Sequence, residues 1–308
     1  MKKCTFYIDD VIFVFRDIAK QKPASIYDHP YMAMLKKAHD LYGMKIQLNI
    51  FLRTDFFYGS DEFTLADMPD TYKDEWTEAS DWLKLAFHAK QEFPDYPYIN
   101  ARYEDIILDY GYFLNEVSRF AGEKSIGVGI LPHWNTVSKD GCRALASFGA
   151  KSIHVTSGIL HDYNGDPFSL PYGHAFRLLN NRQPETRCYS RGSRDTAIEG
   201  ALSGYNHIND TRENSGSKIL KATFDKEIGL YFKDFGNGPV LNLYKLDELE
   251  EILGLLISDE LVSIGNHEQY FYEDYFAYQP EYADKLLKAA KIMQENGFEF
   301  IFPEDIAD

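Results

Sequence analysis

Short apolar runs alternate with longer amphipathic segments along most of this chain, and this alternation limits the possible folds more than any other feature of the sequence. Apolar runs of strand length lie at 5–8 and 45–51, and helical periodicity is found at 31–41 and 101–121. Further strands are predicted at 83–88, 126–131, 151–156, 239–244, 261–267 and 298–302, and further helices at 75–81, 138–148, 247–258 and 281–296. Such alternation predicts an α/β fold with a mostly parallel sheet.

One segment interrupts the alternation. Residues 157–237 are rich in Gly, Asn, Arg, Ser and Tyr and show no sustained periodicity. The chain has 308 residues, of which 44% are hydrophobic, enough for a sizeable core in one large α/β domain or two ordinary ones. We expect a single domain over residues 1–308, with an insertion at about 157–237 that walls a cleft.

The charge balance disfavours two classes of partner. With 48 acidic and 32 basic residues, the formal net charge is -16. Nucleic acids and anionic membrane surfaces are bound through clustered Lys and Arg, so we expect neither as a partner. Aromatic residues make up 15% of the chain, which fits either core packing or a cleft whose rings stack on sugars. The expected partner is a small-molecule or oligosaccharide substrate.

The cysteines and the N-terminus indicate a compartment. The three cysteines, Cys4, Cys142 and Cys188, are odd in number and form no CxxC pair, so a disulfide framework is not expected. The N-terminus lacks the long apolar stretch of a signal peptide, and no apolar run is long enough to span a membrane. These features predict a cytoplasmic protein.

Polar side chains stand where several predicted strands end. Asp9 and Asp10 close the first apolar run, and His88, His133 and His267 come at or just after the ends of later runs. In α/β barrels, functional sites are built at the carboxyl ends of the strands. We therefore expect these five side chains to lie at one edge of the sheet.

An aspartate with two histidines is a common ligand set for a catalytic divalent metal, and zinc accepts both imidazole nitrogen and carboxylate oxygen. Such a metal lowers the pKa of a bound water and polarises a carbonyl group. A second carboxylate can take the water proton, and another histidine can protonate the leaving group. Asp9 and Asp10 would face opposite sides of a regular strand, so both reach one site only if the strand bends.

Four short motifs resemble those of the polysaccharide deacetylase superfamily. They are "FYIDDV" near the start, "FHAKQEF" after the third strand, the Pro-His segment "ILPHWN" and the late "IGNHEQYF". They occur in the family's order over most of the chain and are loosest in the irregular middle. The resemblance implies a distorted, TIM-like (β/α) barrel of about seven or eight strands. It also implies removal of acetyl groups from sugars with a divalent metal, zinc being favoured.

The resemblance assigns roles to individual residues. Asp9 matches the family's catalytic base, and Asp10 matches its metal-ligand aspartate. His88 matches the first histidine of its HxxxH ligand motif, and His267 matches the late histidine that acts as general acid.

The chain also departs from the family pattern. Glu92 stands where the second histidine of HxxxH is expected, so either Glu92 ligates or the third ligand comes from elsewhere. We favour His133, because it ends a strand and follows Pro132. The family's Arg-x-Pro-Tyr segment is missing, and Arg53 is the candidate for the arginine that orients the base.

Several residues could contact substrate, and each also has a simpler structural explanation. Trp134, Tyr270 and Tyr272 could stack on sugar rings or pack in a wall, and Glu92 could lie beside substrate or face solvent. The histidines could equally be core residues bonded to backbone, and the paired aspartates a turn or helix cap.

Three functions follow from these residues. The first is a metal-dependent hydrolase that deacetylates a carbohydrate or a related small amide or ester. The second is a glycoside hydrolase-like enzyme, which would need a carboxylate far from Asp9 in sequence, such as Glu268 or Asp55. The third is a carbohydrate-binding protein of the same fold that has lost the chemistry.

Overall fold

The computed structural model describes residues 1–54, 62–94, 96–155, 174–175, 178–179, 222–234 and 238–306. The predicted helices and strands that bear on the site fall within these ranges. Cys188 and most of the predicted insertion lie outside them.

The first sheet is built around the N-terminal strand and is parallel throughout. Its path runs β3, β2, β1, β8, and β9 pairs with the start of β1. The strands are β1 (Lys2–Val11), β2 (Ile46–Phe51), β3 (Leu83–Ala89), β8 (Leu261–His267) and β9 (Phe298–Ile301). Tyr7 lies opposite both Gln47 and Gly265, and Asp9 lies opposite His267. Because the strands are parallel, their carboxyl ends meet at one edge.

A second sheet continues beyond β3. Its order is β4, β5, β7, β6, with only β6 antiparallel. The strands are β4 (Gly129–Ile130), β5 (Ser152–Val155), β6 (Ala222–Asp225) and β7 (Leu230–Asp234). A parallel bridge from Leu85 to Ile126 joins the two sheets. The predicted α/β fold of the distorted-barrel type is confirmed, although the strands of the described ranges do not close the barrel.

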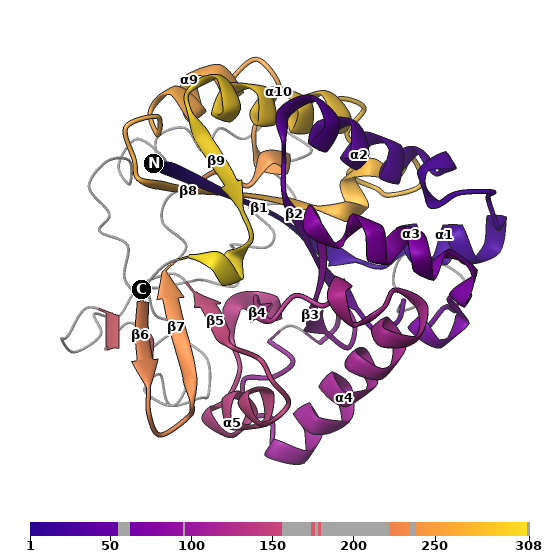
Figure 1. Ribbon diagram of the computed structural model, residues 1–308, viewed down its shortest axis with the longest axis vertical. Coiled ribbons are helices and arrows are strands. Elements are labelled where there is room, and N and C mark those ends of the chain that lie inside the picture. Colours follow the sequence, from indigo (N-terminus) through magenta and orange to yellow (C-terminus); the bar gives the residue numbers. More distant parts are fainter. Residues whose placement is uncertain are drawn as a thin grey trace.

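Helices cover the outer side of this curved strand layer (Figure 1). They are α1 (Phe13–Gln21), α2 (Pro30–Tyr42), α3 (Lys73–Glu78), α4 (Tyr103–Phe120), α5 (Lys139–Ser147), α9 (Leu249–Gly254) and α10 (Tyr282–Glu295). Alternate β1 residues such as Phe6 and Ile8 are fully buried in the apolar core. The opposite face is more polar: Gln47 reaches across to the second sheet, where its Nε2 donates to the Gly129 carbonyl (3.0 Å).

The structure corrects the sequence prediction at three places. The sequence does not predict the helix at Phe13–Gln21, because its first turn is stabilised by Glu268, a residue more than two hundred positions away. The strand predicted at 239–244 is wrong. Only Val240 forms a bridge, to Gly265, and Leu241–Leu243 form a 3-10 turn. The strand predicted at 126–131 shrinks to Gly129–Ile130.

Two further features bear on the sequence expectations. Part of the predicted insertion, residues 222–234, forms the hairpin of β6 and β7, and β7 pairs in parallel with β5. Cys4 and Cys142 are both buried free thiols. Among the described residues, none of the helices combines the length and apolar character needed to cross a membrane.

Candidate metal and hydrolase site

A bend at the end of β1 brings both aspartates to the edge of the sheet. The register between β1 and β2 shifts between Ile8 and Val11, and Asp10 has a φ of 60°. Left-handed backbone is uncommon outside glycine, and Asp is among the residues that tolerate it best. The shift breaks the alternation of the strand, so Asp9 and Asp10 can serve the same site. The bend that a shared site for both aspartates requires is therefore present at the end of β1.

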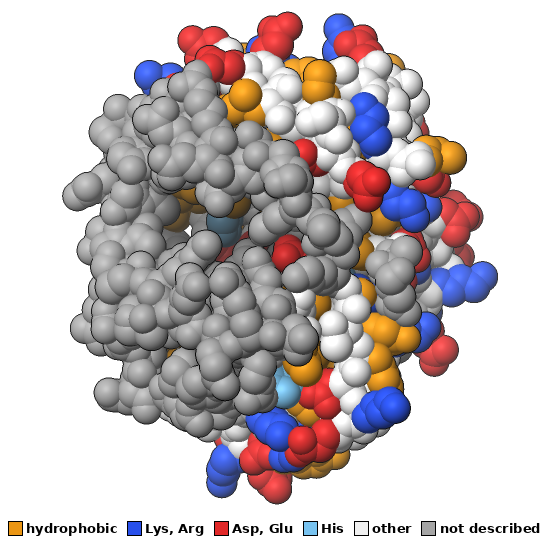
Figure 2. All heavy atoms as spheres, turned by 90° about the vertical axis from the view of Figure 1, so that its left-hand side faces the viewer, with side chains coloured by type: hydrophobic (Ala, Val, Ile, Leu, Met, Phe, Trp, Pro, Cys, Tyr) orange, Lys and Arg blue, Asp and Glu red, His pale blue; other side chains and the backbone are white. Residues whose placement is uncertain are grey.

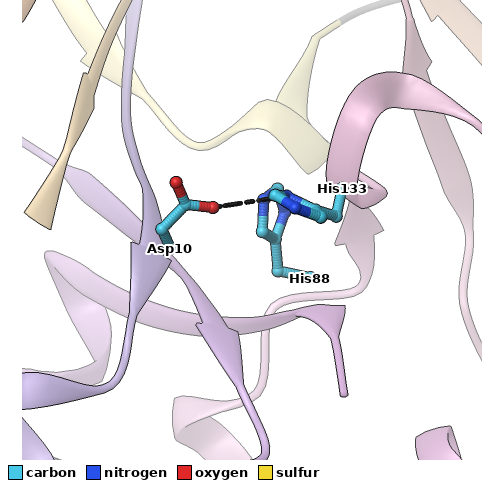
Figure 3. Close-up of side chains that lie close together, drawn as sticks. All are labelled: Asp10, His88 and His133. Carbon is cyan, nitrogen blue, oxygen red and sulfur yellow. Dashed lines mark hydrogen bonds and ion pairs between the residues drawn. The ribbon is translucent and has the colours of Figure 1, made fainter. Parts of the chain in front are cut away.

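Asp10, His88 and His133 converge from three separate elements (Figure 3). His88 lies near the end of β3, and His133 lies in the 3-10 turn His133–Asn135 that follows β4. Asp10 Oδ1 is 3.3 Å from His88 Nε2 and 3.3 Å from His133 Nδ1, and the two ring nitrogens are 3.0 Å apart. All three residues are buried.

The outer nitrogen of each imidazole fixes its tautomer. His88 Nδ1 lies 2.7 Å from the Leu131 carbonyl, and His133 Nε2 lies 3.2 Å from the Glu92 carbonyl. Because a carbonyl oxygen only accepts, both of these nitrogens carry hydrogen. The inner nitrogens therefore turn lone pairs toward each other and toward Asp10. Backbone partners of this kind commonly orient metal-binding histidines.

The spacing of the three ligand atoms fits a small divalent cation. In a tetrahedral zinc site with bonds of about 2.0–2.1 Å, neighbouring ligand atoms lie about 3.3 Å apart. The separations here are 3.0, 3.3 and 3.3 Å. Asp10 Oδ1 is also buried and accepts no well-formed hydrogen bond from the described residues. One nitrogen from each histidine and one carboxylate oxygen suit zinc.

The electrostatics of the cluster favour an ionised carboxylate. Burial alone would raise the pKa of Asp10, but contact with His133 and His88 holds that pKa well below its usual range. Burial opposes protonation of His88, yet the charges of Asp9 and Asp10 outweigh it and raise the pKa of His88. Burial lowers the pKa of His133, and Asp10 offsets this only in part. The two imidazoles thus differ in their affinity for a proton.

The other oxygen of Asp10 meets the segment that follows β8. Gln269 Nε2 donates to Asp10 Oδ2 (2.9 Å), and His267 Nε2 lies 3.9 Å from the same oxygen. The His267 Nδ1–H donates to Asn242 Oδ1 (2.9 Å), which leaves Nε2 facing the cluster. Sequence reasoning missed Gln269 and Asn242. Gln269 could have been suspected from its place two residues after His267.

Asp9 is oriented by an amide. Asn49 Nδ2 donates to Asp9 Oδ1 (2.6 Å), and Gln47 Nε2 in turn donates to Asn49 Oδ1 (2.8 Å). Arg53, proposed from sequence to orient the base, instead donates to Gln91 Oε1 at 2.5 Å. Within the described ranges, the hydrogen-bond partner found for the Asp9 carboxylate is therefore neutral. Gln47 and Asn49 lie two positions apart in β2 and therefore point to the same face of the sheet. This alternation of polar residues could have identified Asn49.

The remaining candidates lie around this cluster. The carboxylate of Glu92 is not part of the three-residue group, although Glu92 is buried and lines a small cavity of about 10 Å³ together with Asp10 and Gln269. A cavity of that size holds about one water molecule. The Trp134 ring centroid is 5.9 Å from that of His133, and the Tyr270 centroid is 6.2 Å from that of His267.

Glu268 is not placed to act as a second catalytic carboxylate. It is fully buried, and its oxygens accept hydrogen bonds from the backbone N–H groups of Ile12, Phe13 and Val14. Asp55, the other candidate for that role, lies outside the described residues. On the face shown in Figure 2, acidic and basic side chains of the described residues are intermingled, as on an ordinary solvated surface.

Comparison with known proteins gives a likeness of fold. No protein-family model and no curated protein sequence matches the chain. Among solved structures, it is similar to a 4-alpha-glucanotransferase from Thermococcus litoralis, with a TM-score of 0.50, 12% identity and 99% of this chain covered. This chain spans 40% of that protein's length.

A protein from Mycobacterium smegmatis, described as a putative polysaccharide deacetylase, is also among the similar chains, with a TM-score of 0.45 and 10% identity, covering 99% of this chain and 90% of that one. A T48 deacetylase with substrate gives a TM-score of 0.44 and 8% identity, covering 99% of this chain and 90% of that one. The Xyl-CE4 domain of a multidomain xylanase, from the hindgut metagenome of Trinervitermes trinervoides, gives 0.44 and 9%, covering 99% and 89%. At these identities the likeness concerns the fold alone, and the case for function depends on the geometry of the site.

Proposed function

We propose that this protein is a metal-dependent hydrolase that removes an acyl group, most simply acetyl, from a carbohydrate or a related small amide or ester. The observation that carries the proposal is the convergence of lone pairs from Asp10, His88 and His133. Both imidazoles have their outer nitrogens bound to backbone carbonyls, and their inner nitrogens lie within 3.3 Å of one carboxylate oxygen. A divalent cation satisfies all three groups at once.

In this proposal Asp10, His88 and His133 hold the metal, and zinc suits their donor atoms best. A bound ion would lower the pKa of water and polarise the acyl carbonyl of the substrate. Asp9, held by Asn49, accepts the water proton. His267 lies on the far side of Asp10, and its Nε2 donates a proton to the leaving nitrogen or oxygen.

The substrate class follows from the surroundings of the site. The partly exposed Trp134 ring lies near His133, where it would stack on a sugar, whereas the buried Tyr270 ring near His267 packs in the wall of the site. The solved structures of similar fold include proteins described as acting on carbohydrates. Glu92 serves as a neighbour of the substrate or of water, because His133 takes the position of third ligand.

The glycoside hydrolase alternative is less well supported. That chemistry needs two carboxyl groups on opposite sides of the scissile bond. Glu268 accepts three backbone hydrogen bonds and is 0% exposed, so it cannot reach a substrate. The third possibility, a binding protein without chemistry, is addressed by direct assay.

The test combines metal retention with acetate release. Purified wild type, supplied with Zn²⁺, should release acetate from acetylated sugars such as N-acetylglucosamine oligomers. Asp9→Asn should keep the metal and lose the release. Metal-loaded wild type that binds these sugars without releasing acetate would favour the binding protein, and full activity in Asp9→Asn would refute the assignment of the base.

A further inference from the structure

Glu268 connects two parts of the site that are far apart in sequence. Its carboxylate accepts hydrogen bonds from Ile12 N (2.6 Å), Phe13 N (2.8 Å) and Val14 N (2.7 Å). Tyr272 Oη donates a further bond to Glu268 Oε1 (3.2 Å). A carboxylate that is 0% exposed thus holds the first N–H groups of α1.

Helix α1 has no N-cap side chain of its own that accepts hydrogen bonds from these N–H groups. Its N-cap position is Ile12, with φ -156° and ψ -27°, and no side chain at that position caps the helix. No acidic residue occurs in its first turn. Free N–H groups at a buried helix start are costly, and a carboxylate there is stabilised by the helix dipole. Glu268 satisfies these donors from the other end of the chain.

Both ends of this contact adjoin proposed catalytic groups. Ile12 lies two residues after Asp10, and the chain between them must leave the left-handed conformation at Asp10 to enter α1. Glu268 directly follows His267, and Gln269 after it donates to Asp10 Oδ2. The segment 267–269 therefore makes two contacts. Gln269 binds the side chain of Asp10, and Glu268 binds the backbone that begins two residues after Asp10.

We infer that Glu268 is a positioning residue that fixes the Asp10 bend and thereby sets the affinity of the site for its metal. Without the carboxylate, the start of α1 loses three charge-assisted hydrogen bonds, and Asp10 no longer has a fixed direction toward His88 and His133. This inference rests on the metal site proposed above. It adds a residue that contacts neither metal nor substrate.

The burial of Glu268 is consistent with such a role. Desolvation raises its pKa to about 7, although the three backbone bonds oppose the shift. Burying a carboxylate to start a helix costs more free energy than placing Ser, Thr or Asp at the N-cap. Unlike a local cap, the Glu268 carboxylate also joins the segment after β8 to the end of β1.

The experiment compares Zn²⁺ affinity in Glu268→Ala, Glu268→Gln and a control, Glu75→Ala. Glu75 is a suitable control because its carboxylate also binds a remote backbone N–H, that of Ile26 (3.1 Å), and its contacts with Ser25 and Ile26 lie outside the site. Affinity is measured by competition with a chromophoric chelator. The visible spectrum of the Co²⁺-substituted protein reports coordination independently of activity. Hydrogen exchange over residues 10–16 reports the state of the α1 start.

Glu268→Ala should weaken Zn²⁺ binding by about 10–100-fold, the usual effect of losing a group that orients a ligand. It should also alter the Co²⁺ spectrum and speed exchange over residues 10–16. Glu268→Gln, which keeps one carbonyl acceptor, should lie between it and wild type. Glu75→Ala should lower the melting temperature without changing Zn²⁺ affinity. If Glu268→Ala does not fold, Glu268→Gln alone carries the comparison.

Two failures are distinguishable. If wild type binds Zn²⁺ and Glu268→Ala, or Glu268→Gln where only that variant folds, binds it equally well, the positioning role is overturned and the metal site stands. If wild type binds no Zn²⁺, the proposed function itself is overturned.

Discussion

A single proton should compete with the metal for the inner nitrogens of His88 and His133. They lie 3.0 Å apart, and their outer nitrogens carry hydrogens donated to backbone carbonyls. Two lone pairs at that distance repel, whereas one proton between them forms a hydrogen bond beside the Asp10 carboxylate. Two protons would place two imidazolium charges in contact. The metal-free cluster is therefore expected to take up one proton as the pH falls.

The pKa shifts of the three residues give the direction in which metal affinity changes with pH. The pKa of His88 is raised from 6.5, that of His133 is lowered, and that of Asp10 is held well below its usual range. Metal binding must expel the proton on His88, so affinity falls as the pH drops below the His88 pKa. Each pH unit then costs about tenfold, or about 1.4 kcal/mol. From about pH 7.5 to 5.5 the loss is at most about 100-fold.

The assay is Zn²⁺ titration by competition across that pH range, with the chelator calibrated at each pH. Calorimetry in buffers of different ionisation heat counts the protons released. The account predicts a slope of about one decade per pH unit and release of about one proton below the His88 pKa. A pH-independent affinity would refute the reasoning, and a slope of two would show that the histidines protonate independently.

Three further outcomes are expected. Asp9→Asn should retain Zn²⁺ and lower the rate of acetate release by about 10²–10⁴-fold, and a smaller loss in steady-state assays would contradict its role as base. Gly265→Ala should destabilise the fold by about 1–3 kcal/mol in urea unfolding, because the new Cβ would lie 2.8 Å from the Tyr7 ring; an unchanged midpoint would show that the ring moves aside. In metal-free protein, the raised pKa of His88 gives stability that is present below pH 6.5 and lost as pH rises through that pKa; His88→Gln should remove this component from melting curves, and persistence of the component would assign it elsewhere.

The strand ends could be predicted from sequence because local patterns determine them. Apolar runs that stop at Asp10, His88 and His267 coincide with β1, β3 and β8, and parallel pairing brings their ends together. The choice of His133 over Glu92 rested on its place after a strand, and the structure groups His133 with the other two residues.

Other features depend on contacts that no local pattern reveals. Helix α1 begins where Glu268 supplies its N-terminal acceptor, so the sequence around Phe13 carries no cap signal. The region around Asn242 is apolar enough for a strand, yet it turns so that the side chain meets His267 and the carbonyl accepts from Gln279. The amides that orient Asp9 and Asp10 come from different elements, Asn49 from β2 and Gln269 from the 3-10 turn after β8, and have no characteristic spacing.

The central claim is that Asp10, His88 and His133 hold one divalent ion, and elemental analysis of purified variants tests it most directly. Wild type should contain about one divalent ion per chain, and His133→Ala should contain almost none. Glu92→Gln should keep the ion, because the Glu92 carboxylate is not part of the three-residue group and the substitution leaves the backbone carbonyl that accepts from His133. Full metal content in His133→Ala, with loss in Glu92→Gln, would contradict the account.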